Sequence, residues 1–210
     1  MSKVKEVAAQ VEAGKSKLVP GLVQEALDDG ASANEILQAM IVAMGVVGDK
    51  FSSGEIFVPE MLIAARAMSK GVKVLKPVLA GEGAQSLGKC ILGTVAGDLH
   101  DIGKNLVGIM MESSGFELID LGVDVSVDKF IEAIETNPEV NLVALSALLT
   151  TTMPSLQKTV ESIRESGLTG FKILVGGAPI TQGFADEIGA DGYAQDAGSA
   201  VTKAKELVGK

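Results

Sequence analysis

Cysteine, histidine, tyrosine and tryptophan are scarce in this chain of 210 residues, which has one each of the first three and no tryptophan. A single cysteine, Cys90, excludes an internal disulfide and a zinc site built from several thiolates, and it fits a reducing cytosol. Aromatic residues make up 3% of the sequence, so aliphatic and small side chains must fill the core. Any chemistry that needs an imidazole must use His100.

Positive charge is also in short supply. Lys and Arg number 18 against 27 Asp and Glu, and a formal net charge of -9 argues against a nucleic-acid partner. The most apolar helical stretch, 36–47, contains Gln38 and is too short to span a bilayer. Residues 1–6 carry charge where a signal peptide needs an apolar stretch. We therefore expect a cytoplasmic protein without membrane contact.

The first part of the chain has the apolar spacing of helices. Stripes run through 4–11 and 18–27, and Ser32 with Glu35 predicts a helix start near 33 that continues to about residue 51. Pro59 suits the first turn of a fourth helix that runs towards residue 79. We predict a four-helix bundle over 1–82 and a glycine-rich linker over 83–88.

Beyond the linker the pattern alternates between short apolar strands and helices. Alternation of this kind predicts a parallel sheet with helices on both faces. We therefore expect an α/β domain over 89–210, flavodoxin-like or Rossmann-like, with ligands at the carboxyl ends of its strands. The expected strands are 89–96, 116–121, 142–148, 172–175 and 192–194, and the expected helices are 104–113, 127–136, 154–166, 182–188 and 197–208.

Unusual residues follow three of these strands, and in this fold they would meet at one rim. Residues 98–103 supply an imidazole and carboxylates, 146–152 supply hydroxyls, and 176–178 supply bare backbone. A lone imidazole two residues after a carboxylate is well placed to bind a metal while the acid orients it. Taken in their order along the chain, these three segments resemble the signature of the cobalamin-binding domain family, which is Asp-x-His-x-x-Gly, then Ser-x-Leu, then Gly-Gly.

The matching residues are Asp98, His100, Gly103, Ser146, Leu148, Gly176 and Gly177. The helical part extends the likeness, since Phe-Val-Pro-Glu-Met at 57–61 and Ala-Arg-Ala-Met at 65–68 are similar to the cap of methyl-transferring corrinoid proteins. That cap occurs in B12-dependent methionine synthase and in the small corrinoid proteins of methanol, methylamine and aryl-ether methyltransferase systems.

The resemblance implies a role for each site residue. His100 would bind cobalt from the lower face and displace the cofactor's own nucleotide base, while Asp98 would hydrogen-bond the other imidazole nitrogen. A hydroxyl would bond Asp98, supplied by Thr152 or by its competitor Ser155. Gly103, Gly176 and Gly177 would line a slot for the displaced nucleotide tail, with Ser146 and Thr150 touching it and Tyr193 closing it. Further expected cofactor contacts are Gly97, Asp101, Ile102 and Leu148, and on the upper face Phe57 and Met61, with Ala64 and Met68.

The implied function is a methyl carrier without complete activity of its own. A substrate-specific methyltransferase would deliver the methyl group, and a second would pass it to tetrahydrofolate or to a thiol such as coenzyme M. A reductive activating protein would restore oxidised cobalt. The alternatives are the cobalamin subunit of a radical mutase, a cobalamin-sensing regulator and a phospho-receiver.

Plainer explanations exist for several of these residues. Asp98 is equally a candidate helix N-cap or metal-binding acid of a receiver, and Asp101 is best explained as a solvated charge at a helix start. Gly176 and Gly177 taken alone fit an ordinary turn, and the threonine run fits a helix entrance. The apolar stripe from Phe57 to Met68 is compatible with a bundle core as well as with a cofactor lid. Cys90 is best explained as an inert, buried residue of a strand.

Overall fold

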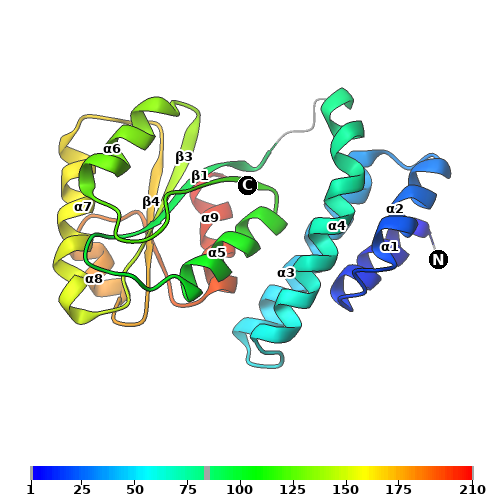
Figure 1. The fold of residues 1–210 in the computed structure, drawn as a ribbon, viewed down its shortest axis with the longest axis horizontal. Coiled ribbons are helices and arrows are strands. Elements are labelled where there is room, and N and C mark those ends of the chain that lie inside the picture. Colours follow the sequence, from blue (N-terminus) through cyan, green and yellow to red (C-terminus); the bar gives the residue numbers. More distant parts are fainter. Residues whose placement is uncertain (1, 83–85, 210) are drawn as a thin grey trace. The chain divides into compact units, whose positions relative to one another are not determined.

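A computed structural model describes residues 2–82 and 86–209, which belong to two compact units that divide between residues 85 and 86 (Figure 1). The first unit contains four helices in its described part: α1 (Lys3–Glu12), α2 (Val19–Asp28), α3 (Ala33–Ser52) and α4 (Val58–Glu82). Ser32 begins α3 as its N-cap, and its hydroxyl accepts a hydrogen bond from the Glu35 N–H at 3.1 Å. The predicted helical bundle is confirmed.

The second unit is built on a five-stranded sheet in the order β2-β1-β3-β4-β5, and every pair of neighbours is parallel. The strands are β1 (Gly88–Thr94), β2 (Phe116–Asp120), β3 (Val140–Ser146), β4 (Lys172–Gly176) and β5 (Gly192–Ala194). The connecting helices are α5 (Ile102–Ser113), α6 (Val127–Thr136), α7 (Met153–Glu165), α8 (Gln182–Glu187) and α9 (Ala197–Leu207), with a 3₁₀ turn η1 (Thr150–Thr152) before α7. The predicted flavodoxin-like α/β domain is confirmed.

Helices cover both faces of this sheet. Figure 1 shows α5 and α9 on one face and α6, α7 and α8 on the other. On the latter face, the fully buried side chains of Phe130, Leu156 and Val160 belong to a hydrophobic cluster with residues of the strands. The chain leaves β1 towards one face and β3 towards the other, so ligands are expected between the ends of these adjacent strands.

Element boundaries differ from the sequence predictions by a few residues. The third strand ends at Ser146, so Leu148 lies in the loop beyond it and not in the strand as predicted. Of the predicted linker at 83–88, residues 83–85 fall outside the described part of the chain, and Gly88 already begins β1. Among the described helices, none combines the length and apolar character needed to cross a bilayer.

Candidate functional site

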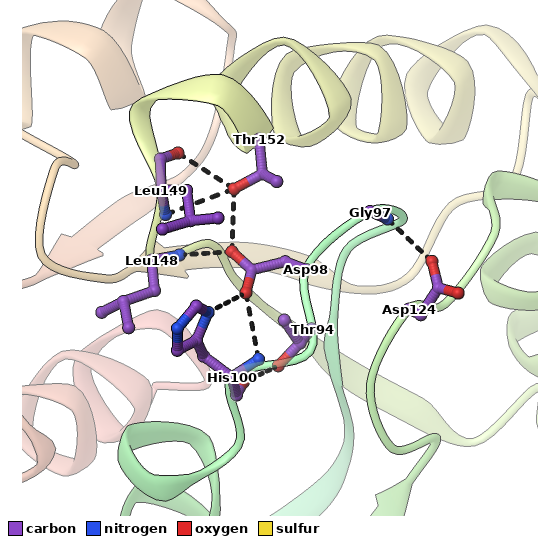
Figure 2. Close-up of polar contacts among 8 residues, drawn as sticks. All are labelled: Thr94, Gly97, Asp98, His100, Asp124, Leu148, Leu149 and Thr152. Atoms are coloured by element: carbon purple, nitrogen blue, oxygen red, sulfur yellow. Dashed lines mark hydrogen bonds and ion pairs between the residues drawn. The ribbon is translucent and has the colours of Figure 1, made fainter.

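Asp98 is the centre of a hydrogen-bond network between the ends of β1 and β3. Its side chain is fully buried, and within the described residues it accepts hydrogen bonds from three partners (Figure 2). Oδ1 faces the His100 N–H at 3.1 Å and the His100 Nδ1 at 2.7 Å. Oδ2 faces the Leu148 N–H at 2.7 Å and the Thr152 hydroxyl at 2.8 Å. One carboxylate therefore links residues 98–100 to residues 148–152.

This network keeps Asp98 ionised. Burial alone raises the pKa of a carboxyl group, because it penalises the charged form. Here the hydrogen bonds from the Leu148 N–H, the His100 N–H, the Thr152 hydroxyl and the imidazole outweigh burial and hold the pKa of Asp98 well below its usual range. An ionised Asp98 can only accept hydrogen bonds, so every partner must present a proton to it.

That requirement sets the state of the imidazole. His100 Nδ1 must carry the proton that it donates to Asp98, so in the neutral ring the lone pair is on Nε2. The His100 side chain is 49% exposed, whereas that of Asp98 has no exposed surface. A half-exposed imidazole whose inner nitrogen is held by a carboxylate is the arrangement typical of a metal ligand.

The structure separates the two hydroxyl candidates for Asp98. Thr152 is 4% exposed and its Oγ1 lies 2.8 Å from Asp98 Oδ2, with the Leu149 carbonyl oxygen as a competing acceptor at 2.9 Å. Ser155 lies within α7, where its carbonyl oxygen accepts a hydrogen bond from the Thr159 hydroxyl. The threonine run forms η1 at the entrance to α7, and this turn carries Thr152 to the carboxylate.

Replacing Thr152 with valine removes one donor from Asp98 at almost constant volume. We expect the free energy of unfolding to fall by about 1–2 kcal/mol, because a buried charged acceptor loses a hydrogen bond. Thr152→Ser, which keeps the hydroxyl, is expected to lose much less. Urea unfolding of the full chain measures both, and Thr151→Val is the matched control because Thr151 is exposed. An equal loss in Thr151→Val would contradict this role of Thr152.

Asp101 takes the N-cap position of α5 without a capping bond from its side chain. It is exposed, and its Oδ2 accepts a hydrogen bond from the Asn105 amide at 3.1 Å. These features favour the interpretation of Asp101 as a solvated charge at a helix start. The N-cap interpretation of Asp98 is wrong, because Asp98 lies three residues before the cap and is buried.

Several contacts that support the site were not expected from the sequence. The Thr94 hydroxyl donates to the His100 carbonyl oxygen at 3.0 Å, and Asp124 Oδ1 accepts the Gly97 N–H at 2.7 Å. The contact from Leu148 to Asp98 uses a backbone N–H, which no side-chain pattern reveals. A threonine at the last position of β1 was the available signal for the first of these contacts.

The three glycines of the predicted slot lie in different surroundings. A Cβ on Gly177 would lie 1.8 Å from the Ala147 carbonyl oxygen, and one on Gly176 would lie 2.9 Å from the Ala194 carbonyl oxygen. Backbone packing therefore requires glycine at both positions whether or not a ligand is present. A Cβ on Gly103 would meet nothing within 4 Å, so open space surrounds this position.

Models of known protein families match both units of the chain. One described as a B12 binding domain matches residues 88–202, and another with the same description matches residues 4–76. The chain belongs to the B12-binding domain family. Membership confirms the family suggested by the motifs and the predicted cofactor, cobalamin or a related corrinoid.

Individual B12-binding relatives align over almost the whole chain. Dimethylamine corrinoid protein 2 of Methanosarcina mazei is 42% identical over 208 residues, which cover 98% of this chain and 96% of the relative. The crystal structure of a cobalamin-binding protein from Desulfitobacterium hafniense is similar with a TM-score of 0.83 and 29% identity, covering 97% of this chain and 98% of the other. A chain of the methanol:cobalamin methyltransferase complex MtaBC from Methanosarcina barkeri gives a TM-score of 0.84 and 27% identity, covering 99% and 80% respectively.

The residues around His100 fit a corrinoid. Large apolar side chains near the imidazole are unusually exposed, with Leu99 at 72%, Ile102 at 81% and Leu148 and Leu149 at 40% each. Exposed apolar side chains of this size indicate a surface that another molecule covers. His100 offers one nitrogen donor, which suits a metal whose other positions are filled by its own macrocycle. This B12-binding domain therefore presents one half-exposed imidazole together with exposed apolar side chains.

Other predicted cofactor contacts of the B12-binding chain lie in different surroundings. Ser146 ends β3 and is half-buried, and Thr150 is exposed in η1. Tyr193 is half-buried on the edge strand β5 and packs against the core beneath α6, α7 and α8. Its contribution to the slot stays a prediction.

The predicted lid stripe on α4 divides into two environments. Met61, Ala64 and Met68 are buried, at 0–1% exposure, which favours the bundle-core interpretation for these three. Phe57 is 67% exposed, and its backbone N–H donates to Glu60 Oε2 at 3.1 Å, which caps the start of α4. Phe57 therefore remains the candidate of this stripe that is free to meet a ligand.

Cys90 has the inert character expected of it. It is buried in β1, and burial raises the pKa of its thiol to about 12. A thiol with so high a pKa is protonated at neutral pH and is a poor nucleophile or metal ligand. Cys90 is thus a core residue.

Proposed function

We propose that this chain is a methyl carrier that holds a corrinoid with its own nucleotide base displaced and with His100 Nε2 as the lower axial ligand. A substrate-specific methyltransferase loads the carrier, and a second methyltransferase unloads it to tetrahydrofolate or to a thiol such as coenzyme M. A reductive activating protein returns inactive cobalt to the cycle. The chain has no complete activity alone.

One observation carries this proposal. Asp98 accepts the Nδ1 proton of His100 at 2.7 Å and so leaves the lone pair on the half-exposed Nε2. The exposed apolar side chains of Leu99, Ile102 and Leu148 provide a platform for a flat macrocycle beside that nitrogen. A neutral imidazole of fixed tautomer and an apolar platform are what a protein must supply to a cofactor that performs the chemistry itself.

Each residue of the network would have a distinct task. A bound corrinoid supplies a cobalt centre that accepts and releases a methyl group. His100 donates electron density from below, and Asp98 raises the donor strength of the ring by accepting its Nδ1 proton. A protonated His100 ring would form an ion pair with Asp98. Thr152 and the Leu148 N–H hold Asp98 ionised throughout, because both donate to its Oδ2.

Methylated amines are the first methyl donors to test. The relative that is 42% identical along 98% of this chain is named a dimethylamine corrinoid protein, whereas the chain from a methanol:cobalamin methyltransferase complex is 27% identical. These names favour a methyltransferase partner over the radical-mutase and regulatory alternatives. Phe57, which is exposed at the start of α4, is the proposed apolar cover for the methyl group.

Because the chain has one histidine, the ligand can be identified by isotope labelling. Protein with ¹⁵N in its histidine, loaded with unlabelled hydroxocobalamin and reduced to the Co(II) state, should give a doublet in the superhyperfine structure of its electron paramagnetic resonance spectrum. Unlabelled protein should give a triplet. A triplet in the labelled sample would show that the cofactor's own base still binds cobalt, contrary to the proposal.

His100→Ala provides the control for this assignment. The variant contains no histidine, so we expect no protein nitrogen on cobalt, and ¹⁵N-labelled imidazole added to the solution should restore a doublet. The side chain is half-exposed, so its removal should change the free energy of unfolding little beyond the lost bond to Asp98. Failure of the labelled imidazole to give a doublet in the variant would contradict a nitrogen ligand at the position of His100.

Methyl carriage itself needs a separate assay. The reduced holoprotein is mixed with a dimethylamine-specific methyltransferase and dimethylamine carrying a labelled methyl group. Label should become bound to this chain and should leave it when coenzyme M and its methyltransferase are added. If no methylated amine, methanol or aryl ether transfers label to the chain through the matching methyltransferase, the carrier function is wrong.

A further inference from the structure

Asp124 contacts the backbone on both sides of Asp98. Its Oδ1 accepts the N–H of Gly97 at 2.7 Å (Figure 2). Its own N–H donates to the carbonyl oxygen of Asp98 at 2.9 Å. The first bond holds the Ala96–Gly97 peptide group and the second holds the Asp98–Leu99 peptide group. Two bonds from one residue thus fix the backbone from which the Asp98 side chain reaches His100.

The turn that Asp124 holds is short, and the Asp98 carboxylate and a turn bond restrain it as well. Gly97 has a φ of +83°, and a turn bond from the Asp98 N–H to the Val95 carbonyl oxygen spans 3.1 Å. Gly97 is exposed, so packing does little to fix its position. A glycine turn without packing is free to change conformation, and the contacts from Asp124 oppose that freedom.

Asp124 itself has an uncommon backbone conformation. With a φ of +51°, it is the one non-glycine residue of positive φ in the described part of the chain. Aspartate tolerates this region better than most residues, yet the conformation is disfavoured and persists where surrounding contacts hold it. Asp124 is exposed, so burial of its side chain does not explain the conformation.

The segment that carries Asp124 lies along the end of β1. The Thr94 N–H donates to the Gly122 carbonyl oxygen at 3.0 Å, and the Val125 N–H donates to the Thr94 carbonyl oxygen at 2.9 Å. Val95 and Val125 form an isolated parallel bridge. The segment from 122 to 125 therefore extends the pairing of β2 with β1 up to the turn, and Asp124 makes its contacts from a fixed base.

We propose that Asp124 is a positioning residue for the Asp98–His100 pair, acting through the Gly97–Asp98 turn to fix the tautomer and orientation of the imidazole. Its effect on cofactor binding rests on the proposed function, whereas its effect on the tautomer does not. Among the described residues, the hydrogen bonds of Asp124 reach Gly97 and Asp98 and not His100, so its proposed effect on the imidazole passes through the turn.

Three variants distinguish the effect of the Asp124 carboxylate from the effect of its left-handed backbone conformation. Asp124→Gly removes the acceptor while allowing the left-handed φ, and Asp124→Asn keeps both an oxygen acceptor and tolerance of that φ. Asp191→Gly is the matched control, because Asp191 Oδ2 accepts the Ile173 N–H at 2.7 Å at the opposite, amino end of the sheet. Asp191→Gly also removes the ion pairs of Asp191 with Arg164 and Lys172, so it is the larger loss of contacts at a place far from His100.

Two measurements on the full chain decide the outcome. In the corrinoid-free protein, imidazole ¹⁵N shifts of the single histidine, taken where the ring is neutral, report its tautomer. We expect the Nδ1–H form in the unmutated chain, a larger fraction of the Nε2–H form in Asp124→Gly, and recovery in Asp124→Asn. Affinity for hydroxocobalamin should fall by about tenfold in Asp124→Gly, the lower end of losses seen when the residue orienting a metal ligand is removed.

Asp191→Gly should change neither the tautomer of His100 nor the affinity for hydroxocobalamin. The proposal is overturned if Asp124→Gly matches the unmutated chain, if Asp191→Gly produces the same changes, or if Asp124→Gly does not fold. If the unmutated chain itself gives no protein nitrogen on cobalt, the proposed function fails, and the tautomer measurement still decides whether Asp124 positions His100.

Discussion

Replacing Asp98 with asparagine is expected to destabilise the α/β unit and to weaken His100 as a ligand, although the two side chains have nearly the same shape. All four hydrogen bonds of the Asp98 side chain in the described structure are accepted by its carboxylate. Each carboxylate oxygen faces one backbone N–H, from His100 on Oδ1 and from Leu148 on Oδ2. An asparagine amide must place its NH₂ group on one of the two sides.

Either orientation leaves a donor facing a donor. With NH₂ towards Leu148, the backbone N–H there loses its acceptor, although the Thr152 hydroxyl can rotate to accept. With NH₂ towards His100, the ring must shift its proton to Nε2 in order to accept at Nδ1, and the Nε2 lone pair is lost. We expect a loss of about 3 kcal/mol in the free energy of unfolding, since a buried donor is left unpaired and a charged acceptor is removed.

The contribution of Asp98 to the free energy of unfolding should also depend on pH. A carboxyl group with a lowered pKa in the folded protein stabilises the fold above its unfolded pKa, and this contribution is lost as the pH falls towards the folded value. The unfolded value for aspartate is about 3.9. The difference in unfolding free energy between the unmutated chain and Asp98→Asn should therefore be largest near neutral pH and should shrink below about pH 4.

Urea unfolding at several pH values, together with hydroxocobalamin titration, measures both effects. Asp101→Asn is the matched control, because it makes the same chemical change three residues away on an exposed side chain. It should alter the unfolding free energy by less than about 0.5 kcal/mol. Equal behaviour of the two variants, or an Asp98→Asn deficit that does not shrink in acid, would refute the central place of Asp98.

Much of this architecture could be predicted from the sequence because side-chain chemistry marks the ends of parallel strands. Asp98, His100 and Thr152 come from two adjacent strand ends, and a parallel sheet brings such ends together. The choice between Thr152 and Ser155 could not be made in advance. It depends on η1, a turn of three residues whose presence moves the hydroxyl by part of a helical turn.

Contacts made by the backbone were beyond prediction. The Leu148 N–H reaches Asp98 because β3 ends at Ser146 and the chain then bends, and no residue type signals the direction of an N–H. Asp124 follows β2, a strand on the other side of β1 from β3, and its φ of +51° is invisible in a sequence. The buried state of Met61 likewise depends on which face of α4 packs inwards.

A second large effect is expected when an alanine replaces Gly177. The added Cβ would lie 1.8 Å from the Ala147 carbonyl oxygen, and the φ of +130° is one that residues with side chains rarely adopt. The backbone of β3 and the turn after β4 would have to separate. Strain and overpacking together predict a loss of about 4 kcal/mol or more in the free energy of unfolding.

Gly103→Ala should have the opposite effect on the protein without its cofactor. Gly103 lies in the first turn of α5, where a Cβ would meet nothing within 4 Å and where alanine is the better helix former. The gain in unfolding free energy should be about 0.5–1 kcal/mol. If the corrinoid's nucleotide tail passes close to this position, hydroxocobalamin affinity should nevertheless fall, because the methyl group would take space needed by the tail.

The two variants together distinguish the requirements of folding from those of binding. Both glycines belong to the motifs that resemble cobalamin-binding domains, yet of these two the fold itself requires Gly177, and not Gly103, to lack a side chain. Unchanged affinity in a folded Gly103→Ala protein would remove Gly103 from the proposed slot. A Gly177→Ala protein that unfolds at the same urea concentration as the unmutated chain would contradict the close approach of the turn to Ala147. Because stability and affinity are expected to move in opposite directions for Gly103→Ala, a general loss of folding cannot imitate the predicted result.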